Sequence, residues 1–269
     1  MKKWIKSILC GVFAVSMLAS TACLDFSKPS SSSSSSASSS EADPTKYNGK
    51  TAAQTYTAIQ TKVEEANSGT IETKMTIGAK TEGMTMEMTM NMISKSNGTN
   101  TYTEVSTKAT GQNVSSKEWY VDGVLYSNAN GYKIKQNMTL EEYQEYTGAS
   151  DDDGSALFKV KNLAGVEFVE EEGGVYFIAP LASSELGELA GSISGSTTGV
   201  VISDVEYIVH IDEDSELRYL EVNFKMVQSV QGMTLNYTVD CTMYIKNLNK
   251  TIISAPSDAG DYVDATSIG

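Results

Sequence analysis

The sequence predicts an α+β protein that is mostly antiparallel β, with a single curved, half-barrel-like sheet of about ten strands. An N-terminal amphipathic helix and short mid-chain helices complete the predicted fold. Two observations support it. After Ala52, apolar residues recur every three or four positions, the period of a helix with one buried face. From Thr70 onward they alternate with polar residues, and turn dipeptides such as Asp122-Gly123 join consecutive runs, as in hairpins.

Composition narrows the function classes. The chain has 269 residues, 40% of them hydrophobic, only four prolines and a formal net charge of −14. These values suit one globular domain with appendages. The acidic balance argues against nucleic acid as a partner, because a phosphate backbone needs a basic surface. A single histidine, His210, rules out zinc sites that need two or more imidazole ligands.

Residues 1–22 have the pattern of a lipoprotein-type signal peptide. A basic start with Lys2, Lys3 and Lys6 precedes an apolar run too short to span a bilayer as a helix of ~20 residues. The Ala22-Cys23 junction resembles a bacterial lipobox, with Ser20 in place of the usual leucine. That resemblance implies cleavage before Cys23, which would carry diacylglycerol with fatty acids such as palmitate. Ordinary secretion with cleavage nearby is the alternative.

Residues 23–44 are expected to be the lipidated cysteine and a serine-rich linker, with the serine run at 30–40. A flexible coil of this length holds the domain ~25 Å from the membrane. Loss of the three signal lysines changes the formal net charge from −14 to −17, so we expect attachment through the lipid and not through a basic surface. The predicted location is extracytoplasmic, on the outer face of the cell membrane.

The helix follows the linker. Its apolar stripe comes between Pro44 and the helix-ending run Asn67-Ser68-Gly69. The residues of the stripe are Ala52, Tyr56, Ile59, Val63 and Ala66.

The strands come next. Asp122-Gly123 between two apolar triplets predicts a tight hairpin, and Asn130-Gly131 predicts a second turn. Alternation predicts strands in the segments 70–77, 84–92, 101–108, 119–121, 124–126, 132–135, 166–169, 175–178, 205–211, 220–226 and 235–245. Cys241, in the last of them, is expected to be a small buried residue and not a reactive thiol. Pro256 is expected to end regular structure.

Helical inserts are predicted in the middle of the chain. Thr139 and Glu142 have the spacing of a capping box, and Ser155 to Leu163 also suits a short helix. The Gly/Ser-rich segment 183–199 suits a surface loop or a mobile lid.

These features resemble the LolA-like superfamily, which includes LolA/LolB carriers and LppX/LprG-type lipoproteins. The stretch from Tyr207 to Met226 resembles the V-x-I-D-x-[DS]-x-x-L hairpin of that family, and residues 117–146 resemble its Y-x-x-G-x-x-Y…Y-K hairpin and helix. Ile252 to Pro256 is similar to its final edge. The resemblance implies that residues 45–269 form one LolA-like β-rich domain, an open sheet wrapped around helices with an apolar pocket for acyl chains.

Catalytic chemistry is not indicated. The chain has no CxxC, GxGxxG, Walker or Ser-x-x-Lys motif. His210 is expected to be a solvated strand residue. The acidic runs 151–153 and 212–214 lack EF-hand spacing and are interpreted as solvated turns. We therefore predict a protein that is not an enzyme, has no cofactor and has no metal site of that kind.

The methionine stripe is the unusual feature, because five methionines occupy alternate positions from 84 to 92. Three hypotheses remain open for it: core packing, a compliant wall for an apolar ligand, or a Cu(I) site. The favoured function is a surface-tethered lipoprotein that binds a lipid or acyl chain in a sheet–helix cavity of at least ~300 Å³ touching this strand. The alternatives are a structural or interaction lipoprotein of the envelope and a methionine-based copper binder. The predicted ligand-binding residues are Tyr56, Ile59, Met84, Met86, Met88, Met90 and Phe224.

Overall fold

The computed structural model describes residues 43–81, 84–147, 157–181, 200–230 and 233–267. The predicted signal peptide, Cys23, most of the linker, the acidic run 151–153 and the segment 183–199 lie outside the described residues.

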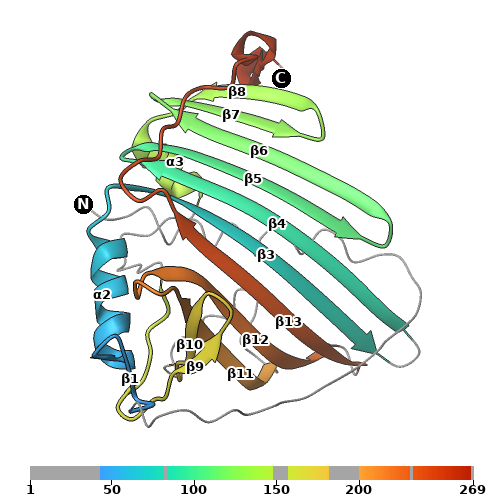
Figure 1. The fold of residues 1–269 in the computed structure, drawn as a ribbon. Helices are drawn as coiled ribbons and strands as arrows, with labels where there is room; N and C mark the ends of the chain where they lie inside the picture. The colour runs from blue at the N-terminus through green and yellow to red at the C-terminus, as the bar shows by residue number, and fades with distance from the viewer. Residues whose placement is uncertain (1–42, 82–83, 148–156, 182–199, 231–232, 268–269) are drawn as a thin grey trace.

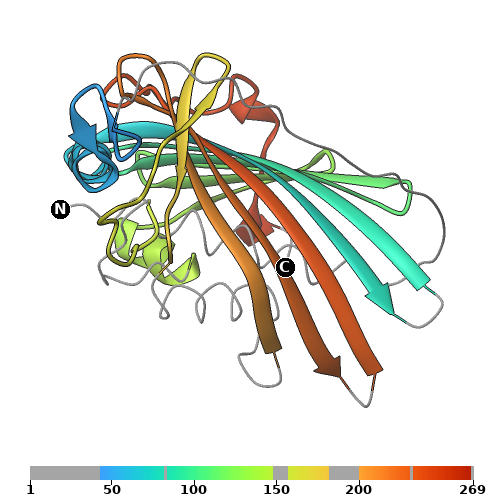
Figure 2. The same cartoon turned by 60° about the horizontal axis from the view of Figure 1, so that its bottom comes forward.

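Twelve strands form one open, curved sheet, which confirms the predicted fold class with two strands more than expected (Figures 1 and 2). Their order across the sheet is β14-β8-β7-β6-β5-β4-β3-β13-β12-β11-β10-β9. A further pair, β1 and β2, precedes the first helix. The bounds are β1 Lys46–Tyr47, β2 Lys50–Thr51, β3 Ser68–Thr81, β4 Met84–Asn97, β5 Asn100–Ala109, β6 Gln112–Val121, β7 Val124–Ala129, β8 Tyr132–Asn137, β9 Val169–Glu171, β10 Gly174–Ile178, β11 Val200–Ile211, β12 Leu217–Val230, β13 Met233–Lys246 and β14 Val263–Asp264.

The sheet consists of two meanders joined at its centre. Strands β3 to β8 follow one another in space, as do β9 to β13, and antiparallel pairing of β3 with β13 connects the two halves. Cys241 lies opposite Met75 in this central pair. The middle of the sheet is therefore built from strands at opposite ends of the domain's sequence.

Helix α2 (Ala52–Glu64) begins where the sequence predicts. Thr51 caps it: its hydroxyl accepts from the Gln54 backbone N–H, and the Gln54 side chain accepts from the Thr51 N–H. The predicted apolar stripe is buried against the sheet. The helix ends at Glu64, before the predicted Asn67-Ser68-Gly69 stop, because β3 already begins at Ser68.

Both predicted turns are confirmed. Asp122 and Gly123 have φ values of 50° and 82°, and Asn130 and Gly131 have 51° and 91°. Two successive residues with positive φ are the geometry of the hairpin turn whose twist matches the flanking strands. These turns connect β6 to β7 and β7 to β8.

The mid-chain predictions are partly confirmed. Helix α3 (Leu140–Tyr146) has the predicted capping box of Thr139 and Glu142. The second helix, predicted over Ser155–Leu163, is wrong for the described residues from Leu157 on. There Val160 forms an isolated bridge with Leu181, and the Lys161 N–H donates to the Pro180 carbonyl at 2.6 Å. Pairing across the chain takes the backbone groups that a helix would need.

Two strand limits also differ from the prediction. The strand expected at 166–169 begins only at Val169, because the Phe168 N–H donates to the Pro44 carbonyl at 2.8 Å. Pro256 does not end regular structure: Val263 and Asp264 pair in parallel with Ile134 and Lys135 of β8. An aromatic contact holds this end, since Tyr262 meets the rings of Trp119 and Tyr126 edge-on.

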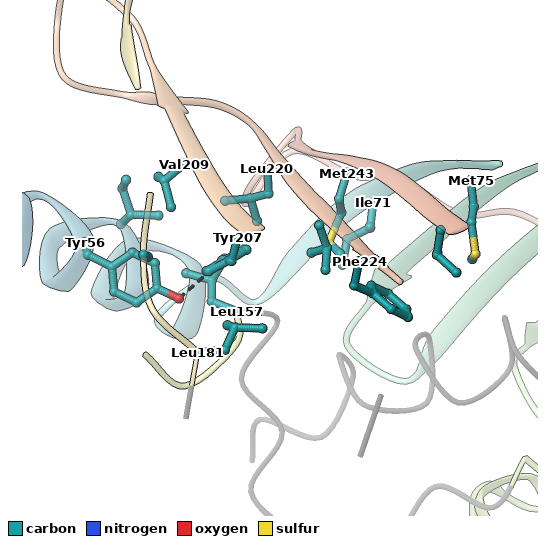
Figure 3. Close-up of a cluster of buried hydrophobic side chains, with 14 of the residues drawn as sticks. Tyr56, Ile71, Met75, Leu157, Leu181, Tyr207, Val209, Leu220, Phe224 and Met243 are labelled. Atoms are coloured by element: carbon teal, nitrogen blue, oxygen red, sulfur yellow. Dashed lines mark hydrogen bonds between the residues drawn. The ribbon is translucent and has the colours of Figure 1, made fainter. Parts of the chain in front are cut away.

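The main core lies between α2, the segment around Leu157 and one face of β3–β5 and β10–β13, and Figure 3 shows part of it. We call this face of the sheet the concave face. A smaller cluster of Tyr120, Leu125 and Tyr143 joins α3 to β6 and β7, with the two tyrosine rings stacked 4.3 Å apart.

Candidate functional site

Met86, Met88, Met90 and Met92 of β4 lie on the concave face, as the alternation predicts. Across the β3–β4 pair, Met90 lies opposite Met75 and Met88 lies opposite Ile77. Met90 and Met92 are each only 2% exposed, whereas Met86 and Met88 are half-buried. The side chain of Met84 lies outside the described residues. The stripe therefore passes from packed core to partly accessible surface within one strand.

Other apolar side chains continue this accessible part across the sheet. Tyr237 of β13 lies opposite Ala79 of β3 and Met226 of β12, and Ile202 of β11 lies opposite Met226 on the other side. Tyr237 and Ile202 are half-buried and pack against the core. Burial raises the pKa of Tyr237, as expected for a phenol held among apolar groups. We call this partly accessible part the methionine surface: Ala79, Met86, Met88, Ile202 and Tyr237.

Three further predicted ligand residues, Tyr56, Met90 and Phe224, lie within the packed core. Tyr56 is 2% exposed, and its hydroxyl donates to the Phe158 carbonyl at 2.5 Å and lies 3.3 Å from the Tyr207 hydroxyl. Phe224 is 4% exposed and lies at a different place in the cluster (Figure 3). Their proposed contact with a ligand stays a prediction.

Ile59, the remaining predicted residue, lines a pocket beside α2. This pocket has a volume of about 300 Å³. It is lined by Ile59, Lys62, Val63, Glu216, Leu217, Ile245, Lys246, Asn247, Leu248 and Lys250. None of the described methionine side chains of the 84–92 strand, Met86 to Met92, lines it, so it differs from the cavity predicted from the sequence.

His210 is where the sequence analysis was wrong. It does face away from Tyr207 and Val209, but it is buried and not solvated, with 5% of its surface exposed. Its ring stacks on Tyr219 at 4.0 Å, and its Nδ1 lies 3.0 Å from both carboxylate oxygens of Glu171. Its Nε2 is 3.6 Å from the nearer oxygen of Glu221. Side chains of neighbouring strands cover His210. The sequence pattern does not specify which strands are neighbours, so this burial could not be predicted without the strand order.

Cys241 agrees with the expectation of an unreactive thiol. It is half-buried against the core, and desolvation raises its pKa to about 12. A thiol with this pKa forms almost no thiolate near neutral pH.

The described residues contain no group of three or more histidine, cysteine, aspartate or glutamate side chains that could hold a metal ion. The methionine-based copper site is a separate hypothesis and stays a prediction. The run 212–214 forms a turn in which an Asp212 carboxylate oxygen accepts from the N–H groups of Asp214 and Glu216 at 3.0 and 2.8 Å. None of the helices within the described ranges is both long and apolar enough to span a membrane.

No protein-family model and no curated protein matches the chain. Solved structures similar to it include a DUF1329 family protein from Desulfovibrio piger, with 10% identity, a TM-score of 0.27 and coverage of 81% of this chain and 98% of that one. A porin-like protein from Bacteroides uniformis has 11% identity, a TM-score of 0.22 and coverage of 66% and 96%. Because these TM-scores are below 0.5, function has to be argued from the residues of this chain.

Proposed function

We propose that the protein is a surface-tethered lipoprotein that binds an apolar ligand, a lipid or an acyl chain, between the concave face of its sheet and the helices. One observation carries the proposal. The methionine stripe is packed solid at Met90 and Met92 but half-buried at Met86 and Met88, with Tyr237 nearby on the same face.

Methionine suits such a surface physically. Its unbranched thioether side chain adopts many shapes and fits ligands that vary in length and branching. Transfer of an acyl chain from water to this face gains ~0.8 kcal/mol per buried CH₂. A dozen methylenes would supply ~10 kcal/mol before the costs of ordering the ligand and the protein.

The tether is part of the proposal. Lipidation of Cys23 followed by the serine run places the domain outside the cell membrane, attached to its outer face. The open sheet with a leading helix supports the resemblance to LolA-like and LppX/LprG-type lipoproteins. Metabolic labelling with a fatty-acid analogue tests the anchor: label in the wild type and its loss in Cys23→Ser are expected, whereas an unlabelled, freely secreted wild type would contradict it.

We also propose that the protein is not an enzyme and acts by binding alone. The sequence motifs of nucleophilic, metal and cofactor chemistry are absent from it. A broad hydrolase screen is the check: turnover that a single aspartate or glutamate substitution abolishes would overturn this part of the proposal.

Native mass spectrometry of protein purified from its own host tests the ligand. Co-purified lipid is expected in the wild type and in Thr85→Glu, which adds a charge to the exposed opposite face of the same strand. Met88→Glu is expected to lose the lipid, because a carboxylate on the methionine surface is costly to desolvate. Bare wild-type protein would favour an interaction lipoprotein instead, and bound copper would favour the methionine-based metal binder.

A further inference from the structure

We infer that the pocket beside α2 binds an anionic amphiphile, a carboxylate or phosphate headgroup attached to a short apolar segment. This site shares no lining residue with the methionine surface, so the inference does not depend on the function proposed above. Three features of the pocket support it: the apolar residues at its base, the charged residues around its opening, and the loop that carries Lys250.

The floor of the pocket is apolar. Ile59 and Val63 reach it from α2, and both are nearly fully buried. Leu217, Ile245 and Leu248 contribute from β12, from β13 and from the segment after β13, and all three are half-buried against the core. A pocket of about 300 Å³ is at the small end of ligand sites, so it suits a short apolar segment and not a whole lipid.

The rim of the pocket, in contrast to its apolar floor, is charged. Three lysines and one glutamate line the pocket. Lys62 pairs with Glu216, and Lys246 pairs with Glu72, which lies outside the pocket, at 2.6 Å. The three lysines and these two carboxylates leave a local charge of +1. Among the described residues, Lys250 forms no ion pair. It is therefore the cation best placed to receive a ligand's charge.

The loop that carries Lys250 is firmly held. Asn247 and Asn249 adopt left-handed backbone conformations, with φ of 54° and 59°, and the Lys250 N–H donates to the Asn247 carbonyl at 2.9 Å. Asn249 ties the loop to the start of β3: its N–H donates to the Ser68 carbonyl, and its side-chain oxygen accepts from the Asn67 N–H, both at 2.8 Å. The backbone of Lys250 is therefore already fixed beside the pocket, and only its side chain has to be ordered when a ligand binds.

Together these features select the ligand class. A free inorganic anion would be attracted to the charged rim but would leave the apolar floor exposed to water. A neutral alkyl chain would cover the floor but would gain nothing from the charge of the rim. An amphiphile with one anionic end uses both, the apolar floor through its chain and the charge of Lys250 through its headgroup.

The experiment is calorimetric titration of the full chain with four probes at concentrations below micelle formation: octanoate, octyl phosphate, octanol and inorganic phosphate. We expect the two anionic amphiphiles to bind more tightly than octanol and inorganic phosphate. Lys250→Glu should weaken them by about tenfold or more, since reversing a nearby charge replaces attraction with repulsion. Lys108→Glu, the same change at an exposed lysine of β5 outside the pocket, should have no effect.

Three results would overturn the inference: equal affinity for octanoate and octanol, binding of inorganic phosphate as tight as that of octyl phosphate, or unchanged affinity in Lys250→Glu. Melting temperatures of the two lysine variants equal to the wild type confirm that folding is intact. Met88→Glu separates the two sites. The variant alters the methionine surface alone, so its affinity for the anionic amphiphiles at the pocket is expected to equal that of the wild type. This result is expected whether or not the methionine surface binds a ligand.

Discussion

Met90 lies opposite Met75 across the β3–β4 pair, and both side chains are almost fully buried, at 2% and 3% exposure. Two residues along the same strand, Met88 is half-buried opposite Ile77. The boundary between packed core and methionine surface therefore falls between two neighbouring methionines of one stripe. Residues on the two sides of this boundary should respond differently to truncation.

Truncation of Met90 is expected to cost far more stability than truncation of Met86. Met90→Ala leaves a cavity in a packed core and should lower the free energy of unfolding by about 2–5 kcal/mol. Met86→Ala removes a side chain that is already partly hydrated and should cost less than about 1 kcal/mol. Urea denaturation of both variants checks this. Equal losses would show that the stripe is uniform and that no accessible surface exists at Met86.

The His210 cluster should stabilise the sheet more than exposed ion pairs do. His210 of β11 and Arg218 of β12 both contact Glu171 of β9, joining the edge hairpin to the longer strands. His210→Ala leaves the Glu171 carboxylate without one partner and removes a buried ring, so a loss of about 1–3 kcal/mol is expected. The control is Lys225→Ala, whose pair with Asp204 is more than 60% exposed at both ends and should cost about 0–1 kcal/mol. Thermal unfolding of both variants makes the comparison, and a smaller effect for His210 would contradict it.

The local elements of the fold could be predicted from the sequence, whereas the contacts between distant strands could not. Periodicity identified α2 and the faces of the long strands, and the Asn and Asp turns identified the hairpins, because both signals are local. The pairing of Met75 with Cys241 joins distant parts of the chain, and no local pattern specifies it. For the same reason the sequence placed His210 on the right face but in the wrong environment, and it did not bring Lys62 and Lys250 together.

Glu118 gives the protein a specific pH dependence. Burial raises its pKa above the ordinary 4.5, although a hydrogen bond from the Tyr146 hydroxyl at 3.3 Å opposes the shift. The folded state therefore holds the proton more tightly than the unfolded state does. The stability gained is fully present below pH 4.5 and is lost as the pH rises through the folded pKa.

Glu118→Gln should remove this contribution. Between pH 4 and pH 7 the unfolding free energy of the wild type is expected to fall relative to that of the variant, measured by urea denaturation at each pH. Parallel pH curves for the two proteins would show that Glu118 is not desolvated in the folded protein.

Cys241 should be protected from thiol reagents. With Cys10 and Cys23 replaced by alanine, it is the single thiol of the chain. Because burial raises its pKa to about 12, labelling by an aromatic disulfide reagent at pH 8 is expected to be slow in the folded protein and fast in guanidinium. Rapid labelling without denaturant would mean that the β3–β13 centre of the sheet opens readily.

Photo-crosslinking with a neutral, diazirine-bearing alkyl alcohol tests the central claim most directly, because peptide mapping reports which face of the sheet the chain touches. We predict saturable adducts on the concave side of β4 and β13, at Met86, Met88 and Tyr237, which excess unlabelled lipid competes away and which Met88→Glu abolishes. Adducts that are not saturable, or that fall on outward-facing residues such as Thr85 and Thr238, would contradict the proposed ligand-binding function.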